Sequence, residues 1–150
     1  MYYESLCSDS IAFVVNQLYP AWDLFKDQLQ IEYRPFGKAN WTETEEGYEF
    51  TCQHGHEECI ANMGQACLLD LFQGYDQEEI VPIISCVMAY RYPPESFGFC
   101  LWTNASPIRY VTWLDCMMDR GQDLLHAIGE ETHALRPALN FVPWILFNLS

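Results

Sequence analysis

Residues 52–67 read Cys52-Gln53-His54-Gly55-His56-Glu57-Glu58-Cys59-Ile60-Ala61-Asn62-Met63-Gly64-Gln65-Ala66-Cys67. Apolar side chains at Ile60, Met63, Cys67 and Leu71 recur at helical spacing, which predicts a helix over residues 57–73. His54 and Gly55 precede this helix, so we interpret them as part of a turn. The cysteines around the turn indicate disulfides that hold it against the rest of the chain.

Cysteine usage indicates an oxidising compartment. The chain has 7 cysteines in 150 residues, together with glycosylation sequons at Asn40, Asn104 and Asn148. If Cys7 is the free thiol, the other six can form three disulfides, and the sequence leaves their connectivity open. Those six are Cys52, Cys59, Cys67, Cys86, Cys100 and Cys116.

Composition excludes several classes of protein. A chain of 150 residues that is 50% hydrophobic can form one domain with a core, and it has no apolar run long enough to span a membrane. With 7 Lys and Arg against 21 Asp and Glu, the net charge of −14 argues against a nucleic-acid partner. This acidity provides solubility or suits an acidic compartment. The chain opens as a strand without a signal peptide, so we expect that a targeting segment has been removed.

Hydrophobic periodicity predicts an α/β beginning and a helical middle. We expect strands at Tyr2–Leu6, Leu29–Tyr33 and Phe141–Phe147, and a hairpin over residues 41–52. We expect helices over residues 9–28 (kinked at Pro20), 57–73, 78–91, about 106–120 and 122–135. Strand, helix, strand, several helices and a strand entered through Pro143 is the order of a thioredoxin-like fold.

The stretch over residues 52–67 also resembles a family signature. It matches C-Q-H-G-x-x-E-C-x-x-N-x-x-x-x-C of the gamma-interferon-inducible lysosomal thiol reductase (GILT) family, at Cys52, Gln53, His54, Gly55, Glu58, Cys59, Asn62 and Cys67. Residues 116–121, Val142-Pro143-Trp144 and the opening Tyr2-Tyr3-Glu4-Ser5-Leu6-Cys7 are similar to the family as well. The resemblance implies one thioredoxin-like domain with a DsbA-like, disulfide-bonded helical insertion. Its core would be residues 1–36 and 138–150, and its insertion residues 40–137.

The resemblance places the catalytic site at Cys7-Ser8-Asp9-Ser10. The family carries Cys-x-x-Cys there, although its invertebrate branch often has serine at the fourth position. A thiol after a strand and at a helix start is favoured as thiolate, the nucleophile of disulfide exchange, so Cys7 is the candidate nucleophile. Ser10 occupies the position of the resolving cysteine and cannot form a disulfide. Pro143 is the expected cis-proline beside the site.

Cys52, His54, His56 and Cys59 also have the ligand types of a zinc site. Their spacing is not that of usual zinc motifs, and the cysteines have disulfide partners available. We therefore predict no metal and no cofactor.

Two functions fit these residues. The first is a secreted or lysosomal thiol–disulfide oxidoreductase of GILT type, with reductase activity weak or absent because the site is Cys-x-x-Ser, acting on a protein disulfide substrate. The second is a non-catalytic secreted protein that binds a protein partner through its surface. A free Cys7 could also join two chains into a dimer. Whether the chain is an enzyme therefore depends on Cys7.

Overall fold

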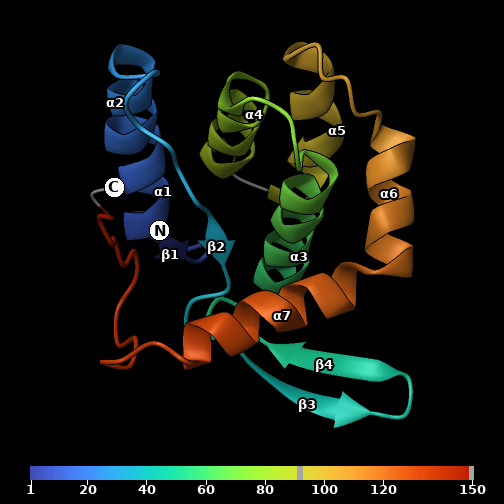
Figure 1. The fold of residues 1–150 in the computed structure, drawn as a ribbon. Coiled ribbons are helices and arrows are strands. Elements are labelled where there is room, and N and C mark those ends of the chain that lie inside the picture. The colour runs from blue at the N-terminus through green and yellow to red at the C-terminus, as the bar shows by residue number, and fades with distance from the viewer. Residues whose placement is uncertain (91–92, 149–150) are drawn as a thin grey trace.

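The computed structural model describes residues 1–90 and 93–148, and it is a mostly helical α/β structure with two small sheets (Figure 1). The predicted end of one helix at residue 91 and the last two residues of the chain lie outside this description. Over the described residues, no helix has both the length and the apolar character needed to cross a bilayer.

The first sheet pairs the start of the chain with a segment that follows the first helices. Strand β1 (Tyr2–Tyr3) lies parallel to β2 (Arg34–Pro35), and Tyr2 forms an isolated antiparallel bridge with Trp144. The predicted strand Tyr2–Leu6 is therefore too long. It stops after Tyr3 because the backbone N–H groups of Ser5 and Leu6 donate to side chains instead of to a neighbouring strand.

The predicted helix over residues 9–28 is a helical run of three parts. They are α1 (Ser8–Phe13), the π-helix η1 (Val14–Leu18) and α2 (Tyr19–Leu24). Pro20 lies in the first turn of α2. Because proline has no N–H group, it removes one bond of the helical ladder, and the run changes its hydrogen-bond spacing just before it.

Two predicted strands are wrong. Residues 29–33 are not a strand, because the side chain of Gln77 takes the place of a neighbouring strand. It accepts from the Ile31 N–H at 2.9 Å and donates to the Ile31 carbonyl at 2.7 Å. The segment Phe141–Phe147 has only the single bridge at Trp144, and it runs back beside the N-terminal elements in Figure 1.

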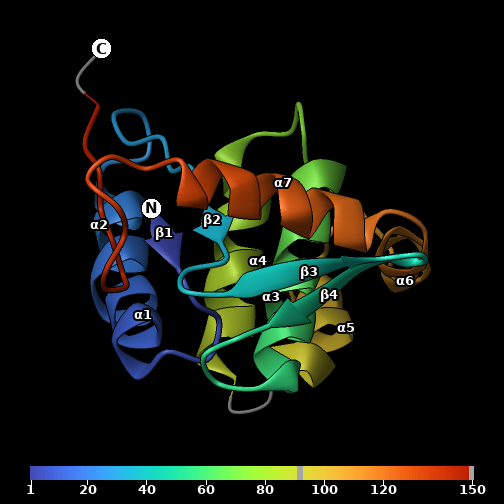
Figure 2. The ribbon, with the colours of Figure 1, turned by 90° about the horizontal axis from the view of Figure 1, so that it is seen from below.

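The hairpin expected over residues 41–52 is confirmed. Strand β3 (Asn40–Thr44) pairs antiparallel with β4 (Gly47–Thr51), with Trp41 opposite Phe50. Seen from below, the hairpin lies beside α7 (Gly121–His133) (Figure 2). A hydrogen bond from the Tyr48 N–H to Gln122 joins the two.

Helix α3 (His56–Leu71) lies at the centre of the described residues and packs against the helices that follow it. These are α4 (Gln77–Ala89), α5 (Pro93–Thr103), α6 (Tyr110–Asp119) and α7. Helix α5 was not predicted. The predicted start of α6 at Ser106 is also wrong, because the Ser106 hydroxyl accepts from the Ile108 N–H and forms a turn before the helix.

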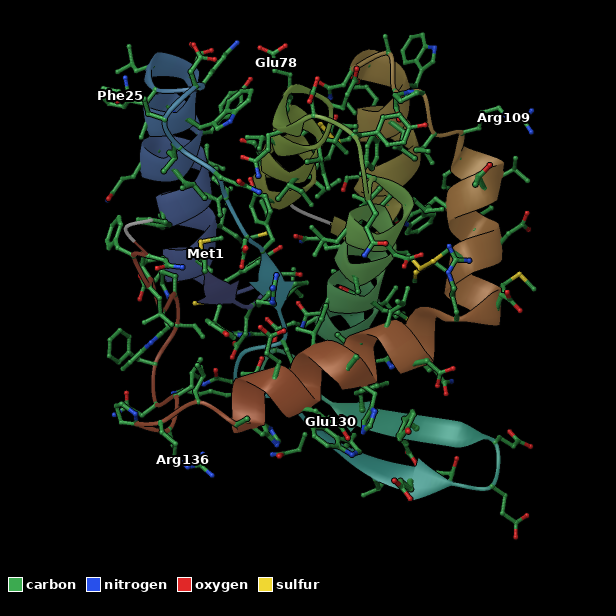
Figure 3. All side chains as sticks on the ribbon, viewed as in Figure 1. Met1, Phe25, Glu78, Arg109, Glu130 and Arg136 are labelled. Carbon is green, nitrogen blue, oxygen red and sulfur yellow. A yellow bond between two sulfur atoms is a disulfide. The ribbon has the colours of Figure 1, made fainter. Side chains whose placement is uncertain are left out.

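The core lies mainly between α3, α4, α5 and the N-terminal helices, around Leu68, Ile83, Ile84, Met88 and Phe97. A smaller cluster lies under the hairpin. Three disulfides connect the six expected cysteines: Cys52–Cys59, Cys67–Cys116 and Cys86–Cys100. The second joins α3 to α6, where Figure 3 shows the side chains packed between the helices.

Candidate functional site

Cys7 lies at the start of the N-terminal helical run. It is the residue just before α1 and has extended backbone angles, while its carbonyl accepts from the Ile11 N–H at 2.9 Å. All seven cysteines belong to the described part of the chain, and Cys7 alone forms no disulfide. Its side chain is half-buried. The structure therefore presents a partly accessible thiol at the junction of a strand and a helix.

Ser10 lies one turn after Cys7 and is fully buried. Its Oγ accepts from the Glu4 N–H at 3.4 Å, so the side chain points toward the segment that follows β1. Residues three apart in a helix share one face. A side chain at position 10 is therefore a neighbour of Cys7 by helical geometry, but the hydroxyl found there cannot form an S–S bond.

The turn before Cys7 is held by helix α3. The Leu6 N–H donates to Glu58 Oε2 at 3.1 Å, and both the Ser5 N–H and the Ser5 hydroxyl donate to Asn62 Oδ1, at 3.0 and 2.6 Å. Glu58 and Asn62 are fully buried. These signature residues therefore contact the two residues that precede Cys7. Asn62 forms these hydrogen bonds through its oxygen alone, and its Nδ2 atom is buried without a partner among the described residues.

Gln65 and Tyr3 belong to the same hydrogen-bond network, and the sequence did not indicate either of them. Gln65, one turn beyond Asn62, donates to Ser5 Oγ at 3.0 Å and accepts from the Tyr3 hydroxyl. Burial raises the pKa of Tyr3 well above its usual value, so that hydroxyl stays protonated and can donate. Gln65 occupies a variable position of the signature. Only its spacing of seven residues from Glu58 could have indicated that it shares the same helix face.

His54 lies between two buried carboxylates. Its Nδ1 atom is 2.8 Å from Glu58 Oε2 and 3.2 Å from Glu4 Oε1. With its amide nitrogen oriented toward Glu4, Gln53 donates to both oxygens of that carboxylate at 2.9 and 3.2 Å. Glu4 also accepts from the Lys38 N–H at 2.8 Å. Burial raises the pKa of Glu4, and the neighbouring Glu58 raises it further.

Among the residues that the structure describes, Glu4, His54 and Glu58 form a group that could hold a metal ion. One ligand atom from each lies within 4.8 Å of the others. The two carboxylates already accept hydrogen bonds from the backbone N–H groups of Lys38, Leu6 and His54. We therefore describe this group as a hydrogen-bonding cluster that links the turn before Cys7 to the start of α3.

The Cys52–Cys59 disulfide fixes the start of α3. It joins the residue after β4 to the first turn of α3, with their Cα atoms 5.6 Å apart. Gly55 precedes the helix with φ of +93°, a conformation that favours glycine. The disulfide uses both thiols of the zinc ligand set considered above, which leaves His54 and His56 without cysteine ligands.

Pro143 lies next to the first sheet. The Val142–Pro143 bond is cis, and the following residue, Trp144, exchanges two backbone hydrogen bonds with Tyr2. The Arg136–Pro137 bond is also cis, which the sequence did not suggest. The structure thus brings the Pro143 segment beside β1, the strand that leads to Cys7.

The three sequon asparagines Asn40, Asn104 and Asn148 are exposed. Asn40 begins β3, whereas Asn104 follows α5 and donates through its amide nitrogen to the Cys100 carbonyl. Leu149 and Ser150, the rest of the third sequon, lie outside the described residues.

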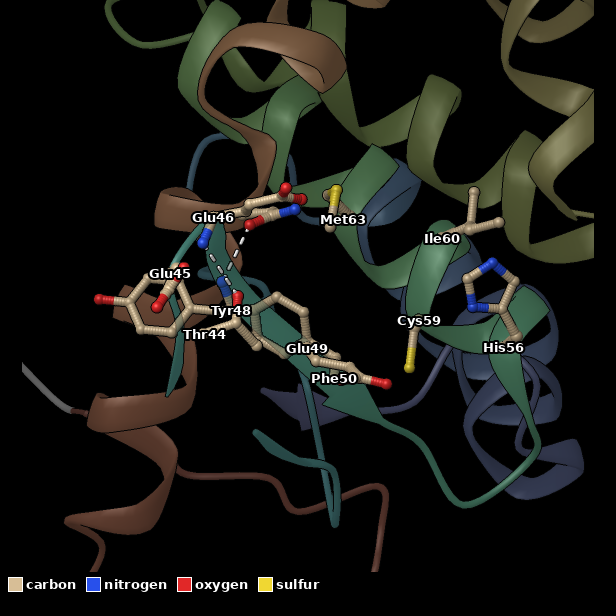
Figure 4. A pocket seen from close by; sticks show the side chains of 11 residues that line it. Thr44, Glu45, Glu46, Tyr48, Glu49, Phe50, His56, Cys59, Ile60 and Met63 are labelled. Atoms are coloured by element: carbon tan, nitrogen blue, oxygen red, sulfur yellow. Dashed lines mark hydrogen bonds between the residues drawn. The ribbon is translucent and has the colours of Figure 1, made fainter. Parts of the chain in front are cut away.

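A separate groove lies between the hairpin and helix α3 (Figure 4). Its lining includes the apolar side chains of Phe50, Ile60 and Met63, and three glutamates of the hairpin also line it: Glu45, Glu46 and Glu49. Cys7 and Ser10 are not among its lining residues. The groove is therefore acidic and partly apolar, and it is distinct from the Cys7 turn.

The chain is similar in sequence to several known proteins. Residues 1–104 match the family model described as gamma interferon inducible lysosomal thiol reductase (GILT). The chain is 35% identical over 149 residues to the gamma-interferon-inducible lysosomal thiol reductase of Mus musculus, which covers 99% of this chain and 59% of that protein. It is 34% identical over 151 residues to a GILT-like protein of Caenorhabditis elegans, covering 99% and 46%.

A plant protein is also similar. The gamma-interferon-responsive lysosomal thiol protein of Arabidopsis thaliana is 31% identical over 150 residues, covering 99% of this chain and 60% of that protein. The chain thus spans about three fifths of the mouse and plant relatives and less of the nematode one.

Proposed function

The chain belongs to the gamma interferon inducible lysosomal thiol reductase family, and we propose that it is a thiol–disulfide oxidoreductase scaffold that works through Cys7 alone. The observation that carries this proposal is a half-buried free thiol at a strand-to-helix turn, with a buried serine one helical turn later. Reductase turnover of this Cys-x-x-Ser site is weak or absent.

Without an added small thiol, the proposed chemistry stops at a mixed disulfide. The Cys7 thiolate attacks one sulfur of a substrate disulfide, the substrate S–S bond breaks, and the second substrate sulfur leaves as a thiolate that takes up a proton. Ser10 cannot attack this intermediate. A small external thiol can attack the Cys7 sulfur and release the substrate thiol. A second molecule of the small thiol then frees Cys7 and forms a small-molecule disulfide.

A thioredoxin-like core is part of the proposal. It is supported by the parallel pairing of β1 with β2 across a helical run, and by the antiparallel bridge from Tyr2 to Trp144 beside cis-Pro143. We assign residues 1–36 and 138–150 to this core and residues 40–137 to a disulfide-bonded insertion. Pro143 would line the substrate side of Cys7.

A secreted or lysosomal location is supported by the cysteines and sequons. Three disulfides persist in oxidising compartments and are rare in the cytosol. The exposed asparagines of the sequons could carry glycans that point into solvent. A protein disulfide is the substrate class we propose, because the family is named for thiol reductases and Cys7 is a free thiol.

Trapping of the mixed disulfide tests the proposal. The protein is incubated with a disulfide-bonded peptide in the absence of small thiol and followed by intact mass. We expect one peptide chain to attach to Cys7 and to remain, because no resolving thiol is present. Ser10→Cys should release the peptide and accumulate an internal disulfide between Cys7 and the introduced thiol. Attachment that persists in Cys7→Ser, or no attachment to the parent protein, would contradict the proposal.

A second candidate is a non-catalytic secreted protein that binds a protein partner. The acidic groove at the hairpin, lined by Glu45, Glu46 and Glu49 together with apolar side chains, favours it. This candidate predicts that Cys7 does not attack the peptide disulfide at all. It also allows Cys7 to link two chains, which a non-reducing gel would reveal as a dimer absent from Cys7→Ser.

A further inference from the structure

Three buried polar side chains on one face of α3 converge on the segment that leads to Cys7. Glu58, Asn62 and Gln65 follow one another at intervals of four and three residues, so they face the same way on the helix. All three are fully buried. Together they contact Tyr3, Ser5 and Leu6 through hydrogen bonds of side chains and backbone.

The turn before Cys7 depends on these contacts. The N–H groups of Ser5 and Leu6 pair with no strand, and a backbone donor shielded from water without a partner is destabilising. The acceptors on α3 therefore select the conformation in which both groups are satisfied. That conformation sets where the Cys7 sulfur lies relative to the first N–H groups of the helical run that starts at Ser8.

We propose that Glu58, Asn62 and Gln65 are positioning residues that hold the Cys7 turn in its reactive geometry. The polar residues of the signature would thus orient the Cys7 thiol by fixing the backbone of the residues before it, although the signature lies about fifty residues further along the chain. The Cys52–Cys59 disulfide and His54 support this role, because both hold the first turn of α3, where Glu58 lies. The inference rests on the proposed role of Cys7 as the nucleophile.

Alkylation of Cys7 by iodoacetamide can separate the effect of the Glu58 hydrogen bonds from the effect of the Glu58 charge. Glu58→Gln keeps an oxygen that can accept from the Leu6 N–H, whereas Glu58→Leu keeps the approximate size and removes the acceptor. Both substitutions remove the same negative charge, so a difference between them reports on the hydrogen bonds that the side chain at position 58 accepts from Leu6 and His54. Glu57→Leu, at the exposed neighbouring position, is the matched control. The disulfides are left intact, so only Cys7 reacts.

The quantity compared is the alkylation rate at about pH 6.5 divided by the rate at about pH 9.5, on either side of the ordinary thiol range. This ratio reports the thiolate fraction and cancels changes in access to the sulfur. We expect the ratio for Glu58→Leu to be lower than that for Glu58→Gln by about fivefold, which is the change in an equilibrium that the loss of one hydrogen bond typically causes. Glu57→Leu should match the parent.

Amide hydrogen exchange of the parent protein provides a test that needs no substitution. We expect the Ser5 and Leu6 amides to exchange as slowly as amides in the middle of α3, since α3 holds both. If Glu58→Leu does not fold, this measurement still tests whether α3 holds the backbone before Cys7.

The outcomes are distinct. Equal ratios for the Gln and Leu variants, or fast exchange at Ser5 and Leu6, would overturn the positioning role while leaving Cys7 as a nucleophile. No alkylation of the parent at either pH would overturn both the nucleophile and its positioning.

Discussion

At the scale of single residues, a cluster of buried polar side chains lies beside the turn that precedes the free thiol of Cys7. Glu4, Glu58, Asn62 and Gln65 are all inaccessible to solvent, yet each has hydrogen-bond partners from a distant part of the chain. Buried polar groups are stabilising only when they are paired in this way. The cluster can therefore specify one geometry for the residues before Cys7.

Glu4 makes the stability of the protein depend on pH. Its pKa is raised above the ordinary value of 4.5 in the folded state, chiefly by burial. The folded state thus binds this proton more tightly than the unfolded state. The resulting stabilisation is present below about pH 4.5 and is lost as the pH rises through the folded pKa.

Glu4→Gln should remove this contribution, because glutamine stays neutral at every pH. We expect the unfolding free energy of the variant, relative to that of the parent, to increase from about pH 4.5 to about pH 7. Urea denaturation at the two pH values measures it. His54 and Glu58 lie close to Glu4 and remain in both proteins, so the comparison reports mainly on Glu4. A relative stability that stays constant or worsens with rising pH would show that Glu4 is not the responsible group.

At the scale of secondary structure, α3 connects the site to the rest of the protein. Its first turn is joined to the hairpin by Cys52–Cys59, its polar face holds the Cys7 turn, and its second half is joined to α6 by Cys67–Cys116. The last disulfide is fully buried and closes a loop with a sequence separation of 49.

Replacement of Cys67 and Cys116 together by alanine should lower the unfolding free energy by about 2–5 kcal/mol, because the unfolded chain loses a long crosslink. Replacing Cys86 and Cys100, with a separation of 14, should cost less. Chemical denaturation without reductant measures both. An unchanged stability without the Cys67–Cys116 pair would contradict the structural role given to it.

The elements that the sequence predicted well are those with strong local patterns. The helix that begins after Gly55 and the hairpin around Gly47 follow from periodicity and turn chemistry. The strand expected around Ile31 failed because Gln77, a distant side chain, satisfies that backbone. Helix α5 was missed because its opening pair, Pro93 and Pro94, resembles a break in structure as much as a helix start.

At the scale of the whole molecule, the chain folds back so that segments from its beginning, middle and end meet near the site. The Pro143 segment returns to β1, and α3 holds the residues that follow the same strand. The sequence indicated Cys7 and Ser10 from the opening of the chain, and Glu58 and Asn62 from the signature over residues 52–67. It could not indicate that Glu58 contacts Leu6, since that contact spans 52 residues and depends on the complete fold.

Reduction of a protein disulfide with excess small thiol, at about pH 4.5 and about pH 7, tests the central claim most directly. The parent is compared with Cys7→Ser and Ser10→Cys under the same conditions. We predict that the parent turns over slowly or not at all beyond the thiol blank, and that Ser10→Cys gains clear activity because it supplies the resolving thiol. A Ser10→Cys protein that is folded but no more active than Cys7→Ser would contradict the claim that this scaffold holds Cys7 ready for disulfide exchange.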